Sequence, residues 1–277
     1  MTDLSFLDRP LIPFYLESGS GLCFSLFFPP EGGGGDVVLF VPPFGEEMNR
    51  TRPMVAMQAR RLASRGIGCL MVDYRGTGDS TGEFREAEWG HWMADMIAAT
   101  GWIRKQGSRL VALWGLRLGA LMAAELCHAG EIDVGRLIFW QPVVDGRQMM
   151  TQFLRIRIAA QMDRGEKQES TAQIRDRLAA GELLEIAGYE LNGRLSEAIE
   201  SRKMHSLRPP GSVRVDWIES KPVGGEGLSR PSEKVVSAWR ENGVEVVDQT
   251  FDGPPFWQLH EREMAPDIID RTTGLFR

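Results

Sequence analysis

Residues 110–119 join a short apolar run to a glycine-framed turn that presents a single side chain. Leu110 to Trp114 predicts a buried strand, Gly115-Leu116-Arg117-Leu118-Gly119 follows it, and the apolar stretch beyond predicts a helix to about Ala129. Paired glycines permit the sharp strand-to-helix turn that lifts a Ser, Cys or Asp nucleophile above a sheet. The presented residue here is Arg117, whose guanidinium stays protonated and therefore cannot attack a carbonyl carbon.

Arg117 predicts anion binding in place of nucleophilic attack. The predicted helix starts at Leu118, so its unpaired backbone N–H groups and positive dipole end converge on the place that the guanidinium occupies. A guanidinium binds a carboxylate or phosphate through two parallel hydrogen bonds. We therefore expect Arg117 and Leu118 to contact a small acyl or anionic ligand. The alternative is a structural Arg117, salt-bridged to Asp145 in an inactive cleft.

Two further segments resemble the loops that surround such a turn in α/β-hydrolases. Asp73-Tyr74-Arg75-Gly76-Thr77-Gly78-Asp79-Ser80-Thr81-Gly82 closely resembles the Asp-x-Arg-Gly-x-Gly-x-Ser loop after the fourth strand of that superfamily. Pro42-Pro43-Phe44-Gly45-Glu46-Glu47 stands in the place of the oxyanion loop, which adds Phe44 and Gly45 to the predicted ligand-binding residues. Similar Pro-Phe-x-Glu-Glu and Gly-Leu-Arg-Leu-Gly segments occur in the group called exosortase A system-associated hydrolase 2.

The resemblance implies a hydrolase of acyl esters or thioesters that uses no cofactor. Through gene context it also implies a link with exopolysaccharide production and a protein partner in that machinery. Two functions stay open at this point. The chain is either a hydrolase that works without a serine at the elbow, which is the glycine-framed turn around Arg117, or a catalytically silent relative. The silent relative would bind an anionic ligand or a protein partner through Arg117 and a helical lid.

Residues that could complete a catalytic triad are few. Acyl transfer in this superfamily requires a histidine after the last strand and an acid that orients it. His260 is the histidine in that region, and it follows the predicted last strand by several residues. Asp145, at the end of a predicted strand next to the elbow, and Glu219 and Glu226, in a later loop, are weak candidates for the acid.

Apolar runs that alternate with helical patterns predict a parallel sheet with helices on both faces. We expect an α/β-hydrolase fold with a mostly parallel central sheet of about eight strands, and a terminal helix from about Leu259. Residues 147–205 break the alternation, because they have helical propensity, a methionine-rich apolar stripe and no convincing buried strand. We expect a helical lid there, with residues 1–146 and 206–277 forming the core.

Composition narrows the classes of partner. A net charge of −6 over 277 residues argues against nucleic acid, which is bound by an excess of Lys and Arg. No apolar stretch approaches the ~20 residues of a bilayer-spanning helix, and the N-terminus lacks a secretory pattern, so we expect a cytoplasmic protein. The three cysteines and four histidines have no metal-ligand spacing, which predicts buried free thiols and no metal site. The oligomeric state is left open.

Overall fold

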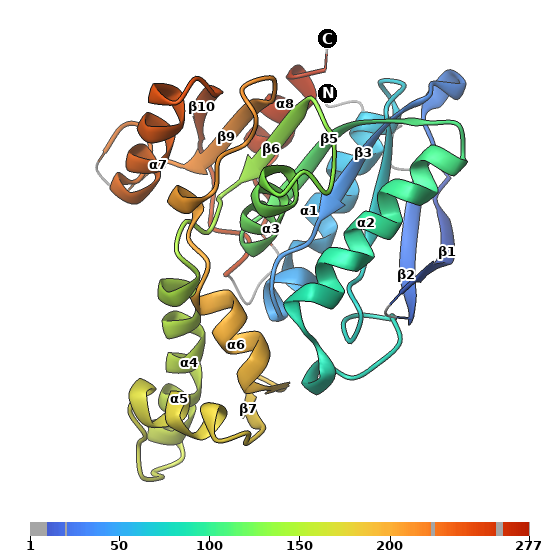
Figure 1. The fold of residues 1–277 in the computed structure, drawn as a ribbon. Coiled ribbons are helices and arrows are strands. Elements are labelled where there is room, and N and C mark those ends of the chain that lie inside the picture. Colours follow the sequence, from blue (N-terminus) through green and yellow to red (C-terminus); the bar gives the residue numbers. More distant parts are fainter. Residues whose placement is uncertain (1–9, 20, 223–224, 259–262, 277) are drawn as a thin grey trace.

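A computed structural model describes residues 10–19, 21–222, 225–258 and 263–276. Its centre is an eight-stranded sheet in the order β1-β2-β4-β3-β5-β6-β9-β10, in which β1 and β2 are antiparallel to their neighbours and the rest run parallel (Figure 1). This confirms the predicted α/β-hydrolase fold. The strands are β1 (Ile12–Ser18), β2 (Gly21–Phe28), β3 (Asp36–Val41), β4 (Gly68–Val72), β5 (Arg109–Leu116), β6 (Arg136–Trp140), β9 (Arg214–Ser220) and β10 (Glu245–Phe251).

Helices cover both faces of the sheet, and the alternation of side chains along each strand supplies both cores. The buried apolar side chains form two hydrophobic clusters, one on each face of the sheet. In β5, Leu113 belongs to the first cluster and the next residue, Trp114, belongs to the second. The first cluster contains α2 (Trp89–Lys105), α3 (Leu118–His128) and α7 (Arg230–Glu241); the second contains α1 (Glu46–Ala63) and α8 (Pro266–Gly274). Cys23, Cys69 and Cys127 are buried and free, as predicted.

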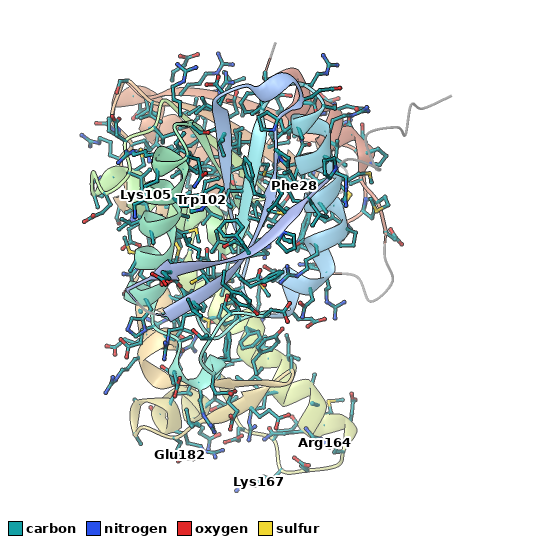
Figure 2. The ribbon with its side chains drawn as sticks, turned by 90° about the vertical axis from the view of Figure 1, so that its right-hand side faces the viewer. Phe28, Trp102, Lys105, Arg164, Lys167 and Glu182 are labelled. Atoms are coloured by element: carbon teal, nitrogen blue, oxygen red, sulfur yellow. The ribbon has the colours of Figure 1, made fainter. Side chains whose placement is uncertain are left out.

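Residues 146–206, called the insertion below, lie between β6 and β9 and outside the central sheet. The insertion projects beyond the carboxyl edge of the sheet, and Figure 2 shows Arg164, Lys167 and Glu182 at its far end. It contains α4 (Gly146–Asp163), α5 (Thr171–Ala179), β7 (Leu184–Ile186), β8 (Tyr189–Leu191), α6 (Gly193–Glu200) and the short 3-10 helix η4 (Met204–Ser206).

The structure contains two features that the sequence analysis did not expect, the hairpin in the insertion and strand β1. The insertion does contain strands, because β7 and β8 pair as a hairpin whose turn residues Ala187 and Gly188 have φ of 52° and 84°. Strand β1 was not expected, although it pairs with β2 along its whole length. The terminal helix α8 begins at Pro266, whereas the expected start at Leu259 lies outside the described residues.

No helix in the described part of the chain has the length and apolarity needed to cross a membrane.

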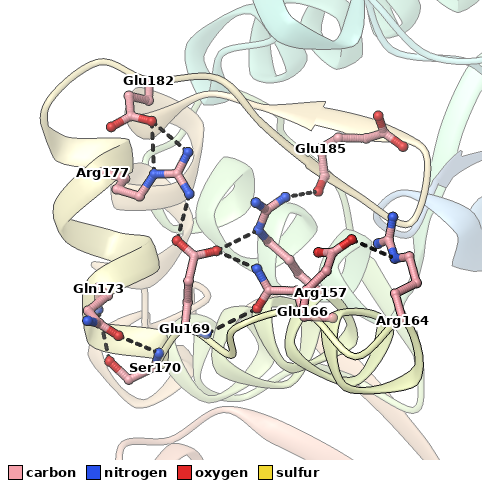
Figure 3. Close-up of polar contacts among 10 residues, drawn as sticks. Arg157, Arg164, Glu166, Glu169, Ser170, Gln173, Arg177, Glu182 and Glu185 are labelled. Atoms are coloured by element: carbon pink, nitrogen blue, oxygen red, sulfur yellow. Dashed lines mark hydrogen bonds and ion pairs between the residues drawn. The ribbon is translucent and has the colours of Figure 1, made fainter.

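A cluster of charges around Glu169 holds the distal part of the insertion together (Figure 3). The Glu169 carboxylate accepts hydrogen bonds from Arg177 at 2.6 Å, Gln161 at 2.8 Å and Arg157 at 3.1 Å. Burial opposes the ionisation of Glu169, but these hydrogen bonds outweigh it and lower its pKa to about 2. The insertion is thus fixed internally by α4, α5 and the loop between them.

Replacing Glu169 by Gln is expected to lower the free energy of unfolding by about 1–2 kcal/mol, because charged hydrogen bonds to two arginines are lost. Since folding lowers the pKa of Glu169, its contribution is present above the ordinary carboxyl pKa and disappears as pH falls from about 4.5 towards 2. Denaturant titrations at pH 7 and pH 3 measure both effects.

Glu166→Gln is the matched control, because its ion pair with Arg164 is about half exposed and is worth about 0–0.5 kcal/mol. Equal stability losses in the two variants at pH 7 would contradict the assigned role of Glu169.

Candidate functional site

The backbone of the elbow has the strained geometry that presents a nucleophile in this fold, although the presented residue is Arg117. Arg117 lies between β5 and α3 with φ 55° and ψ −117°, a conformation that non-glycine residues rarely adopt. Its N–H donates to the Trp140 carbonyl at 3.0 Å, and its carbonyl accepts from the Val143 N–H at 3.1 Å. The end of β6 therefore holds both sides of the turn.

The two glycines of the elbow allow the helix to pack directly on the sheet. A Cβ atom on Gly119 would lie 2.0 Å from the Val41 carbonyl oxygen, and one on Gly115 would lie 2.4 Å from the Ala120 Cα. Neither atom can move away without shifting the backbone of β3 or α3. The predicted structural role of both glycines therefore has a direct steric reason in the structure.

The Arg117 side chain turns inward and contacts Glu47 of α1. Its Nε donates to Glu47 Oε1 at 3.0 Å, its Nη1 donates to the Gln141 carbonyl at 3.4 Å, and the guanidinium carbon lies 5.6 Å from the centre of the Trp257 ring. Only 12% of the Arg117 side chain is exposed. An ion pair and an aromatic face thus occupy the place of a nucleophile and its base.

The expected salt bridge between Arg117 and Asp145 is not formed. Asp145 caps the N-terminus of α4 by accepting a hydrogen bond from the Gln148 N–H at 3.0 Å, and its backbone forms an isolated antiparallel β-bridge with that of Lys203. Helix N-termini favour a side-chain acceptor at this position, because their first N–H groups lack intrahelical partners. Glu47 takes the place beside Arg117 that the sequence had suggested for Asp145.

The Glu47 carboxylate is only half satisfied. Its Oε2 atom is buried and has no hydrogen-bond partner among the described residues, while Oε1 accepts from Arg117. Burial raises the pKa of Glu47, and the nearby guanidinium opposes the rise only in part. A buried carboxylate with one unsatisfied oxygen is a costly arrangement, which Arg117 alone offsets.

A cavity of about 240 Å³ opens in front of the elbow, between the start of the insertion and α7. Residues from four segments of the chain line the cavity, and its volume suits a small polar molecule. Its polar lining residues include Arg117, Gln141, Asp145, Gln148, Gln152 and Ser229.

Glu219, at the end of β9, is fully engaged by its own surroundings. Its Oε1 accepts from Trp217 Nε1 at 2.8 Å and from the Ser232 hydroxyl, and its Oε2 accepts from the Ser229 N–H at 3.2 Å. The residue is only 1% exposed. Glu219 thus ties β9 to α7, and three of the roughly four acceptor positions of its carboxylate are used within the protein.

Phe44 and Gly45 lie beneath the insertion. Phe44 packs edge-on against Phe153 of α4 at 5.0 Å, and a Cβ on Gly45 would meet Phe153 and Tyr189 at 3.9 Å. Leu118 begins α3, so its backbone N–H is one of those that helix geometry leaves without an intrahelical acceptor. Of the four predicted ligand-binding residues, the structure places Arg117 on the cavity wall and Phe44 in an aromatic cluster.

The remaining candidates do not assemble a triad in the described part of the chain. His260 lies outside the described residues, and Glu226 is exposed in the loop after β9. Trp257 stands in the segment after β10, where this fold ordinarily supplies its histidine, and its ring faces Arg117. Among the described residues, an indole from this segment thus lies against the Arg117 guanidinium.

A second cavity, of about 1040 Å³, separates the insertion from the start of α2 and does not include the elbow. Its charges largely neutralise one another, because Arg175 pairs with Glu200 at 2.8 Å and Arg194 with Glu88 at 3.0 Å. This cavity therefore has no large excess of positive or negative charge that would select a ligand of the opposite sign.

Sequence reasoning missed Glu47, Trp257 and Gln141 as neighbours of Arg117. Gln141 has φ 44° and accepts hydrogen bonds from the Ser220 N–H and hydroxyl, which joins the ends of β6 and β9. Glu47 belongs to the Pro-Phe-x-Glu-Glu segment, so a signal for it was present in the sequence. Nothing in the local sequence around Trp257 indicates its position over the guanidinium.

Comparisons with known proteins agree with the fold. A model of the family described as serine aminopeptidase, S33, matches residues 35–181. The palmitoyl-protein thioesterase ABHD10 of Bos taurus, a mitochondrial protein, is 26% identical over 152 residues, which are 55% of this chain and 44% of the relative. The chain therefore matches less than half the length of that relative.

Solved structures show the same architecture over nearly the whole chain. Est1E from Butyrivibrio proteoclasticus, solved with ferulic acid, has a TM-score of 0.66 at 14% identity and covers 95% of this chain and 96% of its own. The α/β hydrolase GrgF from Penicillium sp. sh18 has a TM-score of 0.61 at 18% identity and covers 96% and 98%. At these identities the likeness shows the fold.

The fold and elbow geometry define an α/β-hydrolase. Within this superfamily, the chain belongs to the serine aminopeptidase S33 family, whose model spans more than half of its length. The family name refers to a serine enzyme, whereas Arg117 holds the elbow of this member.

Gly119→Ala is expected to destabilise the fold by at least about 3 kcal/mol, because the added methyl group collides with the Val41 carbonyl. Gly101→Ala in α2 is the control, since a Cβ there meets nothing within 4 Å and a helical alanine stabilises by up to about 1 kcal/mol. Chemical denaturation of both variants measures the difference; equal stabilities would refute the packing described for the elbow.

Proposed function

We propose that this chain binds a small carboxylate- or phosphate-bearing molecule in the cavity in front of Arg117, and does not cleave esters through a covalent intermediate at the elbow. The observation that carries the proposal is the Arg117 side chain itself. It occupies the nucleophile position, pairs with Glu47 and lines the cavity. Loss of the nucleophile alone removes most of the rate enhancement of a serine hydrolase.

The electrostatics of the elbow favour an anion on the side of the guanidinium that Glu47 does not use. Glu47 contacts Nε, whereas the Nη edge has one long hydrogen bond of 3.4 Å to a carbonyl. The first turn of α3 adds N–H groups and its positive dipole end. Together these donors suit a carboxylate or phosphate, while Gln148 and Gln152 can contact polar substituents of the same ligand.

The insertion acts in this proposal as a lid, with boundaries near residues 147 and 205. Its α4 supplies Gln148, Met149 and Gln152 to the cavity wall, and its Phe153 and Tyr189 pack over the loop before α1. A ligand at Arg117 would therefore lie between the sheet edge and the insertion. The adaptable Met149 side chain suits such a contact.

The second candidate is hydrolysis of acyl esters or thioesters by an activated water. Asp145 favours it, because this residue lines the same cavity as Arg117, and a positioned carboxylate can accept a proton from water. The guanidinium would then stabilise the oxyanion. The turnover measurement below decides between the two candidates.

The resemblance to exosortase A system-associated hydrolase 2 suggests a cytoplasmic protein that serves exopolysaccharide production with a protein partner. Deletion of the gene in its host is expected to change exopolysaccharide output, and restoration with the Arg117→Ala variant is expected to fail. Full restoration by that variant would separate Arg117 from the cellular role.

The pure protein is expected to show no fluorophosphonate labelling and no turnover of p-nitrophenyl butyrate or butyryl-coenzyme A above a heat-treated control. The physical reason is that the elbow presents a protonated guanidinium in place of a serine hydroxyl. Turnover that the Asp145→Asn variant loses would favour the hydrolytic candidate, whereas labelling of a serine would contradict both candidates, because neither uses a serine nucleophile.

Inorganic phosphate or benzoate is expected to raise the Tm through binding at Arg117. A ligand at a concentration of about ten times its Kd raises the free energy of unfolding by about 1.4 kcal/mol. This corresponds to a rise in Tm of about 3 °C for a chain of this size. The Arg117→Ala variant should lose the shift, whereas Arg155→Ala, which removes the same charge from an exposed site, should keep it. Equal shifts in the two variants would eliminate Arg117 as the binding residue.

A further inference from the structure

The first turn of α1 contacts the elbow and the insertion through adjacent residues. Glu47 points to Arg117, and its neighbour Glu46 accepts a hydrogen bond from the Tyr189 hydroxyl of β8 at 3.2 Å. Asn49, one turn further along, donates to Glu46 at 3.1 Å and to the Tyr189 oxygen at 3.3 Å. One helical turn therefore joins two sites that lie far apart in the sequence.

The insertion contacts the core beside this turn, and it is also held by hydrogen bonds from Asn192, Arg194 and Arg202 to other parts of the core. The Tyr189 ring packs edge-on against Phe84 of the short helix η3 (Phe84–Glu86) at 4.9 Å, and Phe153 packs against Phe44 at 5.0 Å. Burial raises the pKa of Tyr189 to about 12, with the adjacent Glu46 adding to the rise, so the hydroxyl remains a donor at neutral pH. These aromatic rings reach the core where the loop Pro42–Gly45 leads into α1.

Glu47 binds the Arg117 guanidinium as an anionic ligand would, but with only one of its two carboxylate oxygens. It offers only Oε1 to the guanidinium, and Oε2 stays buried without a partner in the described structure. A free carboxylate or phosphate can instead bind a guanidinium through two oxygens, which makes shorter and stronger hydrogen bonds. An external anion therefore has an advantage over the internal carboxylate at the same cation.

We propose that Glu47 is a displaceable internal ligand of Arg117, and that an anion which replaces it releases the insertion from the first turn of α1. The inference rests on the proposed function, because it needs an anion to bind at Arg117. It adds a regulatory contact that keeps the insertion docked while the elbow has no external ligand.

The displacement has a direct physical consequence for the helix. Once Arg117 pairs with an external anion, Glu47 becomes a buried carboxylate without a countercharge, which is strongly unfavourable. Its release towards water shifts the first turn of α1, and Glu46 moves with it. The Tyr189 hydrogen bond and the Phe44–Phe153 contact then weaken, which loosens the insertion over the cavity.

Hydrogen exchange of the peptide covering residues 184–191, read by mass spectrometry, tests the release. Glu47→Gln removes the charge and should speed exchange by about fivefold or more without any ligand. Inorganic phosphate should produce the same change in the unaltered protein. Glu131→Gln, which removes one exposed negative charge remote from the elbow, is the matched control and should exchange at the original rate.

Phosphate affinity, measured by calorimetry, tests the coupling from the other direction. Glu47→Gln should bind phosphate about tenfold more tightly, because Arg117 no longer has an internal partner. Tyr189→Phe leaves the ion pair intact but removes the hydroxyl contact, so by reciprocity it should also bind phosphate more tightly and exchange faster in residues 184–191.

The outcomes separate the two proposals. If phosphate binds, requires Arg117 and leaves the exchange of residues 184–191 unchanged, the displacement proposal is overturned and the proposed function stands. If no anion binds any variant while Glu47→Gln still speeds exchange, the proposed function is overturned and only the coupling of Glu47 to the insertion survives. The displacement proposal would be overturned outright if Glu47→Gln and Tyr189→Phe had the same hydrogen exchange in residues 184–191 and the same phosphate affinity as Glu131→Gln.

Discussion

The ion pair between Arg117 and Glu47 determines what the elbow can do. Arg117 stands where this fold presents its nucleophile, and a permanently charged side chain at that place needs a countercharge because only 12% of it is exposed. Glu47 supplies the countercharge from α1, and Trp257 covers the guanidinium from the segment after β10. The elbow of this chain thereby surrounds a cation with an acid and an indole.

Backbone contacts and close packing at two glycines hold the geometry of the elbow. Gly115 and Gly119 allow close packing of α3 on β3 and β5, and the N–H and carbonyl of Arg117 bond to the end of β6. These constraints act on the backbone of the residue whose φ is 55°. The strained turn here places Arg117 on the wall of a small polar cavity.

Most of the fold could be predicted from local patterns in the sequence. The apolar runs at β3, β4 and β5 and the glycine-framed turn are short-range signals, and they predicted the parallel sheet and the elbow. The hairpin β7–β8 was missed because its strands have three residues each and its turn uses Ala187-Gly188, a weaker signal than Asn-Gly. Strand β1 was missed at the sheet edge, where Ile12, Pro13 and Tyr15 are exposed and periodicity is weak.

The partners of Arg117 could not be predicted in the same way. Glu47 is 70 positions away in the sequence, and the choice between it and Asp145 depends on which carboxylate caps a helix and which faces the elbow. Asp145 has the short side chain that suits a helix N-terminus, whereas the longer Glu47 reaches across from α1. Such a choice is settled by tertiary geometry, which the types of residue alone do not specify.

A double-mutant cycle on the free energy of unfolding tests the central claim most directly. Arg117→Ala, Glu47→Ala and the double variant are compared by denaturant titration at pH 7. The account predicts an interaction energy of about 1.5–3 kcal/mol, since each single change leaves a poorly compensated charge in the cleft. Additive losses within about 0.3 kcal/mol would show that the two side chains do not depend on each other, and would contradict the account.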